Sequence, residues 1–136
     1  MQLDILRRMS KLEQIFQSLK QANKKALIPY IMAGDPDIDT TFELLKKLPE
    51  AGADVIELGM PFTDPMADGP EIQEAGIRSL NNGTKVQDIL NTVARFREHN
   101  TEIPLILMGY FNPIFAYGVE KFCKDAARAG VNGLLI

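Results

Sequence analysis

The chain has 136 residues with a formal net charge of −3, and 46% of its residues are hydrophobic while 24% are charged. This balance is typical of a globular protein long enough to bury a core, and it predicts a single domain over residues 1–136. Because the chain lacks a basic surface for nonspecific binding of a phosphate backbone, nucleic acid is not an expected partner. The single Cys123 excludes an internal disulfide framework and, with only one histidine, argues against a Cys/His metal site.

The sequence shows no recognisable targeting signal. No apolar run approaches the ~18 residues that a membrane helix needs, and the N-terminus lacks the apolar block of a secretory signal. The acidic residues Asp4 and Glu13 argue against a transit peptide, a class that is poor in acidic residues. We therefore expect a cytoplasmic protein with no membrane partner.

Helices and strands alternate along the chain with short connections and no Ser/Gly-rich linker. In chain order, the predicted elements are a helix over 11–22, a strand over 26–32, a helix over 39–50, a strand over 54–58, helices over 70–80 and 86–96, a strand over 103–108, a helix over 119–130 and a strand over 133–136. This order predicts an α/β fold with a parallel sheet and right-handed crossovers.

Local signals support the individual elements. Ser10 with Glu13, and Thr84 with Gln87, form the capping-box pattern that starts a helix. The first helix is amphipathic, and we interpret it as a cover over the bottom of the core rather than as a partner surface. In the first strand, Pro29 removes one backbone donor. Four residues at helical spacing predict the buried face of the last helix: Val119, Phe122, Cys123 and Ala126.

Acidic and aromatic residues gather where the second and third predicted strands end. Glu57 interrupts an apolar strand, Asp68 lies eleven positions later in the loop over 59–70, and Tyr110 follows the third strand. Loops at the carboxyl ends of parallel strands gather on one face, so we expect all three residues at one mouth. Apolar neighbours would desolvate the Glu57 carboxylate and favour proton exchange near neutral pH, whereas Asp68 could stay ionised and accept a hydrogen bond from a ligand.

Each of these residues also has a purely structural interpretation. Glu57 could form a salt bridge with a lysine or arginine of a neighbouring strand. Asp68, like Asp64, could serve as a turn or N-cap residue. Tyr30 and Tyr110 could be ordinary core aromatics. The residues alone leave both interpretations open.

Other chemistries have little support in the sequence. It contains no glycine-rich phosphate loop of either common pattern, no nucleophile elbow and no histidine pair for a metal. None of the predicted strands holds a lysine that could form a Schiff base. The chemistry that remains is acid–base catalysis by carboxylates, without a metal or a cofactor.

Three segments resemble the tryptophan synthase alpha subunit family. The run ELGMPFTDPMADGPEIQ over 57–73 closely resembles the family signature, while IPYIMAGDP over 28–36 and MGYFNPI over 108–114 resemble its first and third strands with their loops. The resemblance implies a (β/α)8 TIM barrel that cleaves indole-3-glycerol phosphate to indole and glyceraldehyde 3-phosphate in tryptophan biosynthesis. It also implies a partner, the beta subunit, which receives the indole in a complex of two alpha and two beta subunits.

The resemblance further implies roles for individual residues. Glu57 would move protons at indole C3 and at the glycerol hydroxyl, and Asp68 would hold the indole N–H. The residues implied to line the indole pocket are Tyr30, Met108 and Tyr110. Those implied to face the beta subunit are Pro61, Asp64 and Pro65.

The chain departs from the family in length, because a barrel of this type needs about 250 residues and eight strands. In the family, the second half holds the substrate phosphate and supplies a mobile loop after strand six. We therefore expect the N-terminal half of a barrel that carries both carboxylates, lacks the phosphate grip and is inactive alone. It could be a fragment of a longer protein or a non-catalytic half-barrel that self-associates through its sheet edges. A different phosphate-sugar lyase or isomerase is a further alternative, against which the proline-rich loop argues.

Overall fold

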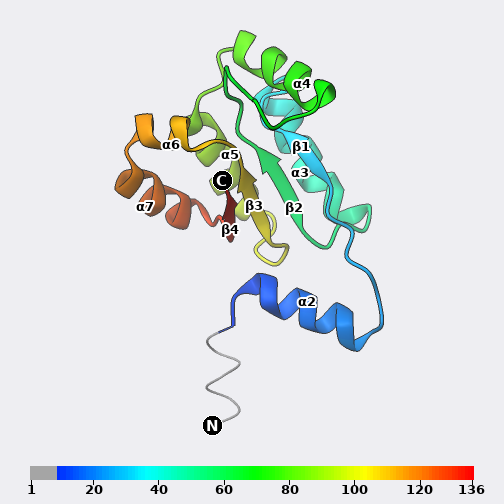
Figure 1. Cartoon of the computed structure of the whole chain (residues 1–136). Helices are drawn as coiled ribbons and strands as arrows, with labels where there is room; N and C mark the ends of the chain where they lie inside the picture. Colours follow the sequence, from blue (N-terminus) through cyan, green and yellow to red (C-terminus); the bar gives the residue numbers. More distant parts are fainter. Residues whose placement is uncertain (1–8) are drawn as a thin grey trace.

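A four-stranded parallel sheet forms the centre of the computed structural model, which describes residues 9–136 (Figure 1). Residues 1–8, and with them Asp4, lie outside the described part of the chain. The strands follow one another in the order β1-β2-β3-β4, and each neighbouring pair is parallel, which confirms the predicted α/β fold. The elements are α2 (Lys11–Gln21), β1 (Tyr30–Met32), α3 (Ile38–Glu50), β2 (Ile56–Gly59), α4 (Pro70–Asn81), α5 (Val86–Arg97), β3 (Leu105–Met108), α6 (Phe111–Tyr117), α7 (Val119–Ala129) and β4 (Gly133–Leu135).

Three of the strands, β1, β2 and β3, begin later than predicted, and a proline directly precedes two of them. Pro29 stands directly before β1 and Pro104 directly before β3. Neither residue has an N–H to donate to a ladder, although each carbonyl still accepts a bond from β2. The N–H of Glu57 donates to Pro29 O at 3.0 Å, and that of Ile56 donates to Pro104 O at 2.9 Å.

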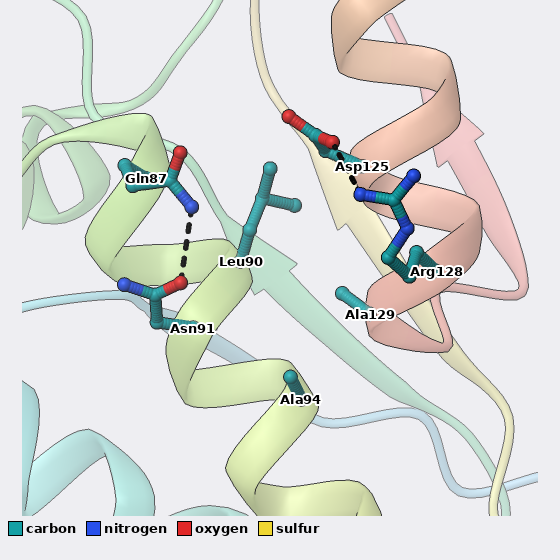
Figure 2. A pocket seen from close by; sticks show the side chains of 7 residues that line it. All are labelled: Gln87, Leu90, Asn91, Ala94, Asp125, Arg128 and Ala129. Carbon is teal, nitrogen blue, oxygen red and sulfur yellow. Dashed lines mark hydrogen bonds and ion pairs between the residues drawn. The ribbon is translucent and has the colours of Figure 1, made fainter.

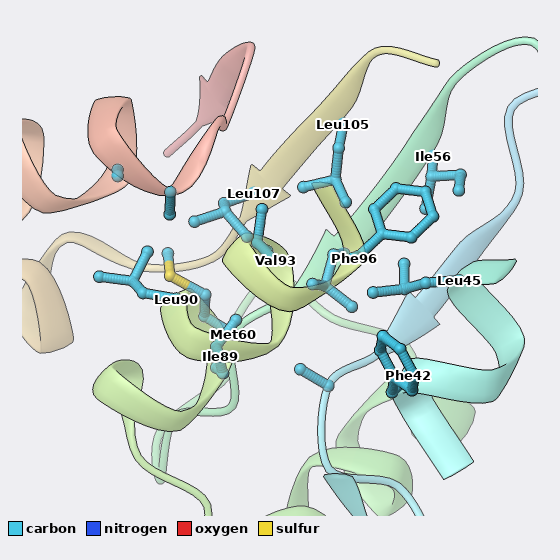
Figure 3. Close-up of a cluster of buried hydrophobic side chains, with 14 of the residues drawn as sticks. Phe42, Leu45, Ile56, Met60, Ile89, Leu90, Val93, Phe96, Leu105 and Leu107 are labelled. Atoms are coloured by element: carbon cyan, nitrogen blue, oxygen red, sulfur yellow. The ribbon is translucent and has the colours of Figure 1, made fainter. Parts of the chain in front are cut away.

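The main core lies between one face of the sheet and the helices that cover it (Figure 3). Alternate residues of the central strands are fully buried in this layer, namely Ile56 and Leu58 of β2 and Leu105 and Leu107 of β3. The covering helices supply the opposing side chains, among them Phe42, Leu45, Ile89, Val93, Phe96 and Phe122. Because side chains alternate along a strand, the intervening residues of β2 and β3 point to the other face of the sheet.

α2 lies across the amino ends of the strands, as the cover interpretation predicted (Figure 1). Its predicted capping box is confirmed, since Ser10 Oγ accepts the Glu13 N–H at 3.2 Å and Glu13 Oε2 accepts the Ser10 N–H at 2.6 Å. Leu12 packs against Gly133 of β4, where an added Cβ would meet Leu12 Cδ1 at 3.2 Å. Leu12 thus contacts the sheet, whereas no residue of α2 is buried and Phe16 of its apolar side is exposed.

The second predicted capping box is wrong by one residue. α5 is capped at Lys85, whose N–H donates to Asp88 Oδ2 at 2.9 Å, so Thr84 and Gln87 do not form the box. Thr84 is buried and lies against Gly34 in the loop after β1. Thr84 thus packs against this neighbouring loop, and the next residue, Lys85, is the N-cap of α5.

The third strand leads into a helix that the sequence did not predict. Phe111–Tyr117 form α6, and Pro113 stands third in it, where a backbone N–H has no intrahelical partner to lose. α7 was predicted, but Val119 and Cys123, which were assigned to its buried face, are exposed. The residues of α7 that are buried are Phe122, Ala126 and Ala129. Within residues 9–136, no helix combines the length and the apolar character that crossing a membrane requires.

Candidate active site

Glu57 sits in the middle of β2, with its side chain on the face of the sheet opposite the helix-covered core. Ile56 and Leu58 on either side are fully buried in that core, whereas Glu57 is half-buried. The strand register places Tyr30 of β1 and Ile106 of β3 beside Glu57. Alternation along the strand thus explains how an apolar run can carry a carboxylate without placing it in the core.

Asp68 lies in the loop that leads from β2 to α4. Its N–H donates to Pro65 O at 3.1 Å, and its carbonyl accepts from Gln73 Nε2 at 2.8 Å. Gly69 is the N-cap of α4, and Pro70 takes the first helical position, where its fixed φ suits the helix. The Asp68 side chain therefore does not cap the helix, which removes one of its two structural interpretations.

Tyr30 of β1 stands beside Glu57 in the strand register. Burial raises the pKa of Tyr30 above its ordinary value, and the negative charges of Asp68 and Glu57 raise it further. Both carboxylates thus contribute to the electrostatics at Tyr30 although eleven residues separate them in the sequence. The structure places Glu57 beside Tyr30 and Asp68 in the loop after β2, and the meeting of the two acids at one mouth stays a prediction.

The carboxyl end of β3 borders the same region. Tyr110 directs its hydroxyl to the β2–α4 loop, where it accepts the Ala67 N–H at 2.9 Å, and its ring lies 5.6 Å from that of Phe62. Met108 pairs with Gly59, two positions beyond Glu57, and so lies on the same face of the sheet as that carboxylate. The structure thus places Tyr30 and Met108 on the face of the sheet that carries Glu57, and Tyr110 against the loop that carries Asp68.

Two residues at the site were not singled out from the sequence. Gln73 of α4 donates through Nε2 to the carbonyl of Asp68 and, at 3.5 Å, to that of Pro65. Gly59 lies under the Tyr30 ring, because a Cβ built on it would overlap the hydroxyl oxygen. Both stand inside the run over 57–73, but the run does not reveal their contacts, which are with Tyr30 of β1 for Gly59 and with two loop carbonyls for Gln73.

The three residues predicted to face a partner differ in exposure. Pro61 is buried, Pro65 is half-buried and Asp64 is exposed. A groove of about 340 Å³ lies between this loop and α4, and its lining includes Pro65 and the exposed Ile77. The structure therefore brings Asp64 and Pro65 to the surface, and Pro61 contributes to the packing beneath it.

The salt-bridge interpretation of Glu57 finds no support in the structure. Within residues 9–136, the ion pairs of lysine and arginine involve neither Glu57 nor Asp68. In the same part of the chain, no three His, Cys, Asp or Glu side chains are grouped so that they could hold a metal ion. The two carboxylates and the Tyr30 hydroxyl offer groups that can exchange protons with a ligand and accept its hydrogen bonds.

A second concavity, of about 320 Å³, lies between α5 and α7, away from the carboxylates (Figure 2). Its polar side chains are paired within their own helices: Gln87 Nε2 donates to Asn91 Oδ1 at 3.0 Å, and Arg128 lies 3.5 Å from Asp125. None of the predicted site residues lines this groove.

The parallel sheet in sequential order, the helices on its outer face and the acidic side chains near the strand carboxyl ends define the class of protein. These are the features of a TIM barrel, in which the loops after the strands build the active site. The chain belongs to the tryptophan synthase alpha chain family, whose model matches residues 16–136. The family is one of tryptophan biosynthesis, and the expected family and fold are confirmed.

Several solved structures resemble the chain closely. The tryptophan synthase alpha subunit of Legionella pneumophila str. Paris is 47% identical with a TM-score of 0.91, and the match covers 94% of this chain and 49% of that one. A protein from Aquifex aeolicus VF5 is 40% identical with a TM-score of 0.89, covering 94% and 51%. A chain of the tryptophan synthase a2b2 complex of Pyrococcus furiosus is 47% identical with a TM-score of 0.78, covering 82% and 47%. The chain thus spans about half the length of these relatives and matches half of their barrel.

Proposed function

We propose that this chain is the part of a tryptophan synthase alpha subunit that carries its two catalytic carboxylates. The reaction is the retro-aldol cleavage of indole-3-glycerol phosphate to indole and glyceraldehyde 3-phosphate. The observation that supports this proposal most strongly is that Glu57 of β2 stands beside Tyr30 of β1 on the face opposite the core, while the loop that follows β2 carries Asp68. Membership of the family makes this reaction the natural assignment for that pair.

In the proposed mechanism, Glu57 manages the protons and Asp68 orients the ring. Protonated Glu57 delivers its proton to indole C3, and the resulting carboxylate then takes the proton of the glycerol hydroxyl as the bond between C3 and the glycerol chain breaks, which returns Glu57 to its protonated form. The hydroxyl carbon leaves as the aldehyde of glyceraldehyde 3-phosphate, and indole is released. Asp68 accepts a hydrogen bond from the indole N–H, which an ionised carboxylate does well. The proposed indole pocket is bordered by Tyr30, Met108 and Tyr110, and no metal or cofactor takes part.

The proposed partner is a tryptophan synthase beta subunit in the cytoplasm. The Pyrococcus furiosus relative forms an a2b2 complex, which makes such a partner plausible for this chain. Asp64 and Pro65, which reach the surface next to the groove on α4, would contact it, with Pro61 supporting them from below. Neither nucleic acid nor a membrane is a proposed partner. The substrate phosphate would be held by the half of the barrel that this chain does not match.

A chimeric barrel tests this function. Residues 16–136 would replace the matching half of the Legionella pneumophila subunit, whose similarity to this chain favours correct docking. We expect the chimera to produce indole from indole-3-glycerol phosphate, and Glu57→Gln to reduce its turnover by roughly 10²–10⁴-fold, the usual contribution of an acid–base group.

The matched control is Glu71→Gln, which removes an exposed carboxylate from the first turn of α4. This variant should keep the turnover of the parent chimera. The assignment is wrong if the Glu57→Gln chimera retains normal turnover, or if a correctly folded parent chimera produces no indole.

A further inference from the structure

Asp68 is held in place through its backbone rather than through its carboxylate. Among the hydrogen bonds within residues 9–136, those at Asp68 involve its N–H and its carbonyl, which bond to Pro65 O and Gln73 Nε2. The preceding residue, Ala67, donates its N–H to the Tyr110 hydroxyl at 2.9 Å. Gln73 therefore fixes the peptide group that follows the Asp68 Cα, and Tyr110 fixes the Met66–Ala67 peptide, one peptide group further back from it.

These two side chains come from different parts of the barrel. Tyr110 follows β3, forty-three residues after Ala67, and its ring also packs on Phe62 near the start of the same loop. Gln73 lies in the first turns of α4 and bridges two loop carbonyls, those of Pro65 and Asp68. The carboxylate itself stays available, because every bond that holds the loop is made to the main chain.

We infer that Tyr110 and Gln73 are positioning residues that aim the Asp68 carboxylate at a ligand N–H and thereby set the selectivity of the site. This inference rests on the proposed function, in which Asp68 recognises the indole N–H. A hydrogen bond depends steeply on distance and angle. A small shift of the loop would therefore weaken the bond between the Asp68 carboxylate and the ligand N–H before it weakened other contacts. Contacts with the apolar part of the ring depend far less on such a shift, since dispersion has no direction.

The hydrogen bond by which Tyr110 holds the loop can be tested without any ligand. In the 136-residue chain, Tyr110→Phe removes only the acceptor of the Ala67 N–H, and we expect hydrogen exchange of that amide, measured by NMR, to become at least about tenfold faster. Tyr117→Phe is the matched control, because it also removes one phenolic oxygen, here one bonded to Gln87 and Asp125 on the helices. Unchanged exchange at Ala67 in Tyr110→Phe would overturn the inference.

Selectivity is tested with indole and with indene, which has the same bicyclic shape and no N–H. The chain contains no tryptophan, so the fluorescence of bound indole can be followed directly and indene can be titrated as a competitor. We expect the wild-type chain to prefer indole by about tenfold, as one hydrogen bond to a charged group allows, and Asp68→Ala to abolish this preference. Tyr110→Phe and Gln73→Leu should reduce the preference severalfold, because the dissociation constant for indole rises more than that for indene.

The outcomes separate the inference from the function on which it rests. If both ligands weaken equally in Tyr110→Phe, the residue only lines the pocket and the inference is overturned. If the preference of wild type equals that of Asp68→Ala, the proposed role of Asp68 in recognition fails. The inference that Tyr110 and Gln73 set selectivity then fails together with the proposed role of Asp68, and it fails also if neither ligand binds. Hydrogen exchange at Ala67 still decides separately whether Tyr110 holds the loop.

Discussion

Gly59 shows at the scale of one residue how an absent side chain shapes the candidate site. A Cβ at this position would overlap the hydroxyl of Tyr30, a half-buried residue that stands beside Glu57 in the strand register. We expect Gly59→Ala to lower the free energy of unfolding by about 1–3 kcal/mol, the usual cost of overpacking, measured by urea denaturation. The Tyr30 ring would have to move, so its ring resonances should shift as well.

Gly76 is the matched control for this prediction. A Cβ there would meet only Met32 Cε, at an ordinary 3.6 Å, and the residue lies inside α4. Alanine is the better helix former by up to about 1 kcal/mol, so Gly76→Ala should leave the free energy of unfolding unchanged or raise it. Similar losses in the two variants would contradict the proposed overlap at Gly59.

At the scale of the elements, Arg97 joins the end of α5 to the segments before β3 and β4. Its half-buried guanidinium donates to the carbonyls of Gly130 (2.9 Å), Asn100 (3.1 Å) and Ile103 (2.8 Å), and to Asn132 Oδ1 (2.6 Å). Burial lowers the pKa of Arg97, so its hydrogen bonds offset a desolvation cost. The planar fork of arginine is what allows one side chain to satisfy four acceptors.

We expect Arg97→Lys to lower the free energy of unfolding by about 1.5–3 kcal/mol, because a lysine retains the charge but leaves buried acceptors unpaired. Urea denaturation measures the change. Arg128→Lys is the control, since Arg128 is 81% exposed and pairs with Asp125 at 3.5 Å; its effect should stay within about 0.5 kcal/mol. Equal effects of the two substitutions would show that the four contacts contribute little.

Most elements could be predicted from the sequence because each has a local signal. The capping box at Ser10 and the apolar spacing of α5 depend only on neighbouring residues, and both were correct for the helix they indicated. α6 was missed because Pro113 normally indicates a break, whereas in the first turn it costs no hydrogen bond. Cys123 was assigned to the core because the spacing of small and apolar residues could not separate it from the adjacent Phe122.

The candidate site was predictable only in part, because the sequence reveals local patterns but not contacts between distant residues. Glu57 could be found because a carboxylate in an apolar strand stands out, and the rule for parallel sheets then placed Asp68 near it. The contacts that hold the loop, from Tyr110 and Gln73, join residues that are distant in sequence or have no pattern of their own. They could be found only once the strands were placed side by side.

At the scale of the whole molecule, apolar side chains are exposed at both edges of the sheet. Leu27 and Ile28 beside β1 are 54% and 40% exposed, and Leu134, Leu135 and Ile136 at β4 are 44%, 55% and 54% exposed. Parallel strands with unpaired apolar edges readily pair with another chain. We therefore expect the 136-residue chain to self-associate, with an average mass in sedimentation that rises with concentration.

A lysine at the β4 edge should weaken this association, because a charge there must lose its water when another strand pairs. Leu135→Lys should shift sedimentation toward the monomer, while Met66→Lys, at an 86% exposed position in the β2–α4 loop, should not. A wild-type chain that remains monomeric at every concentration would contradict the prediction.

The alternation along β2 has a practical consequence for protein engineering. Ile56 and Leu58 pack in the core, whereas Glu57 between them faces the candidate site. Adjacent positions therefore determine different properties, namely stability and chemistry. A library that varies the helix-facing positions would sample thermal tolerance while the chemistry is held constant. A second library at Tyr30, Ile106 and Met108 would sample new ligands on an unchanged framework. The two sets of positions along the strand can therefore be mutated independently of each other.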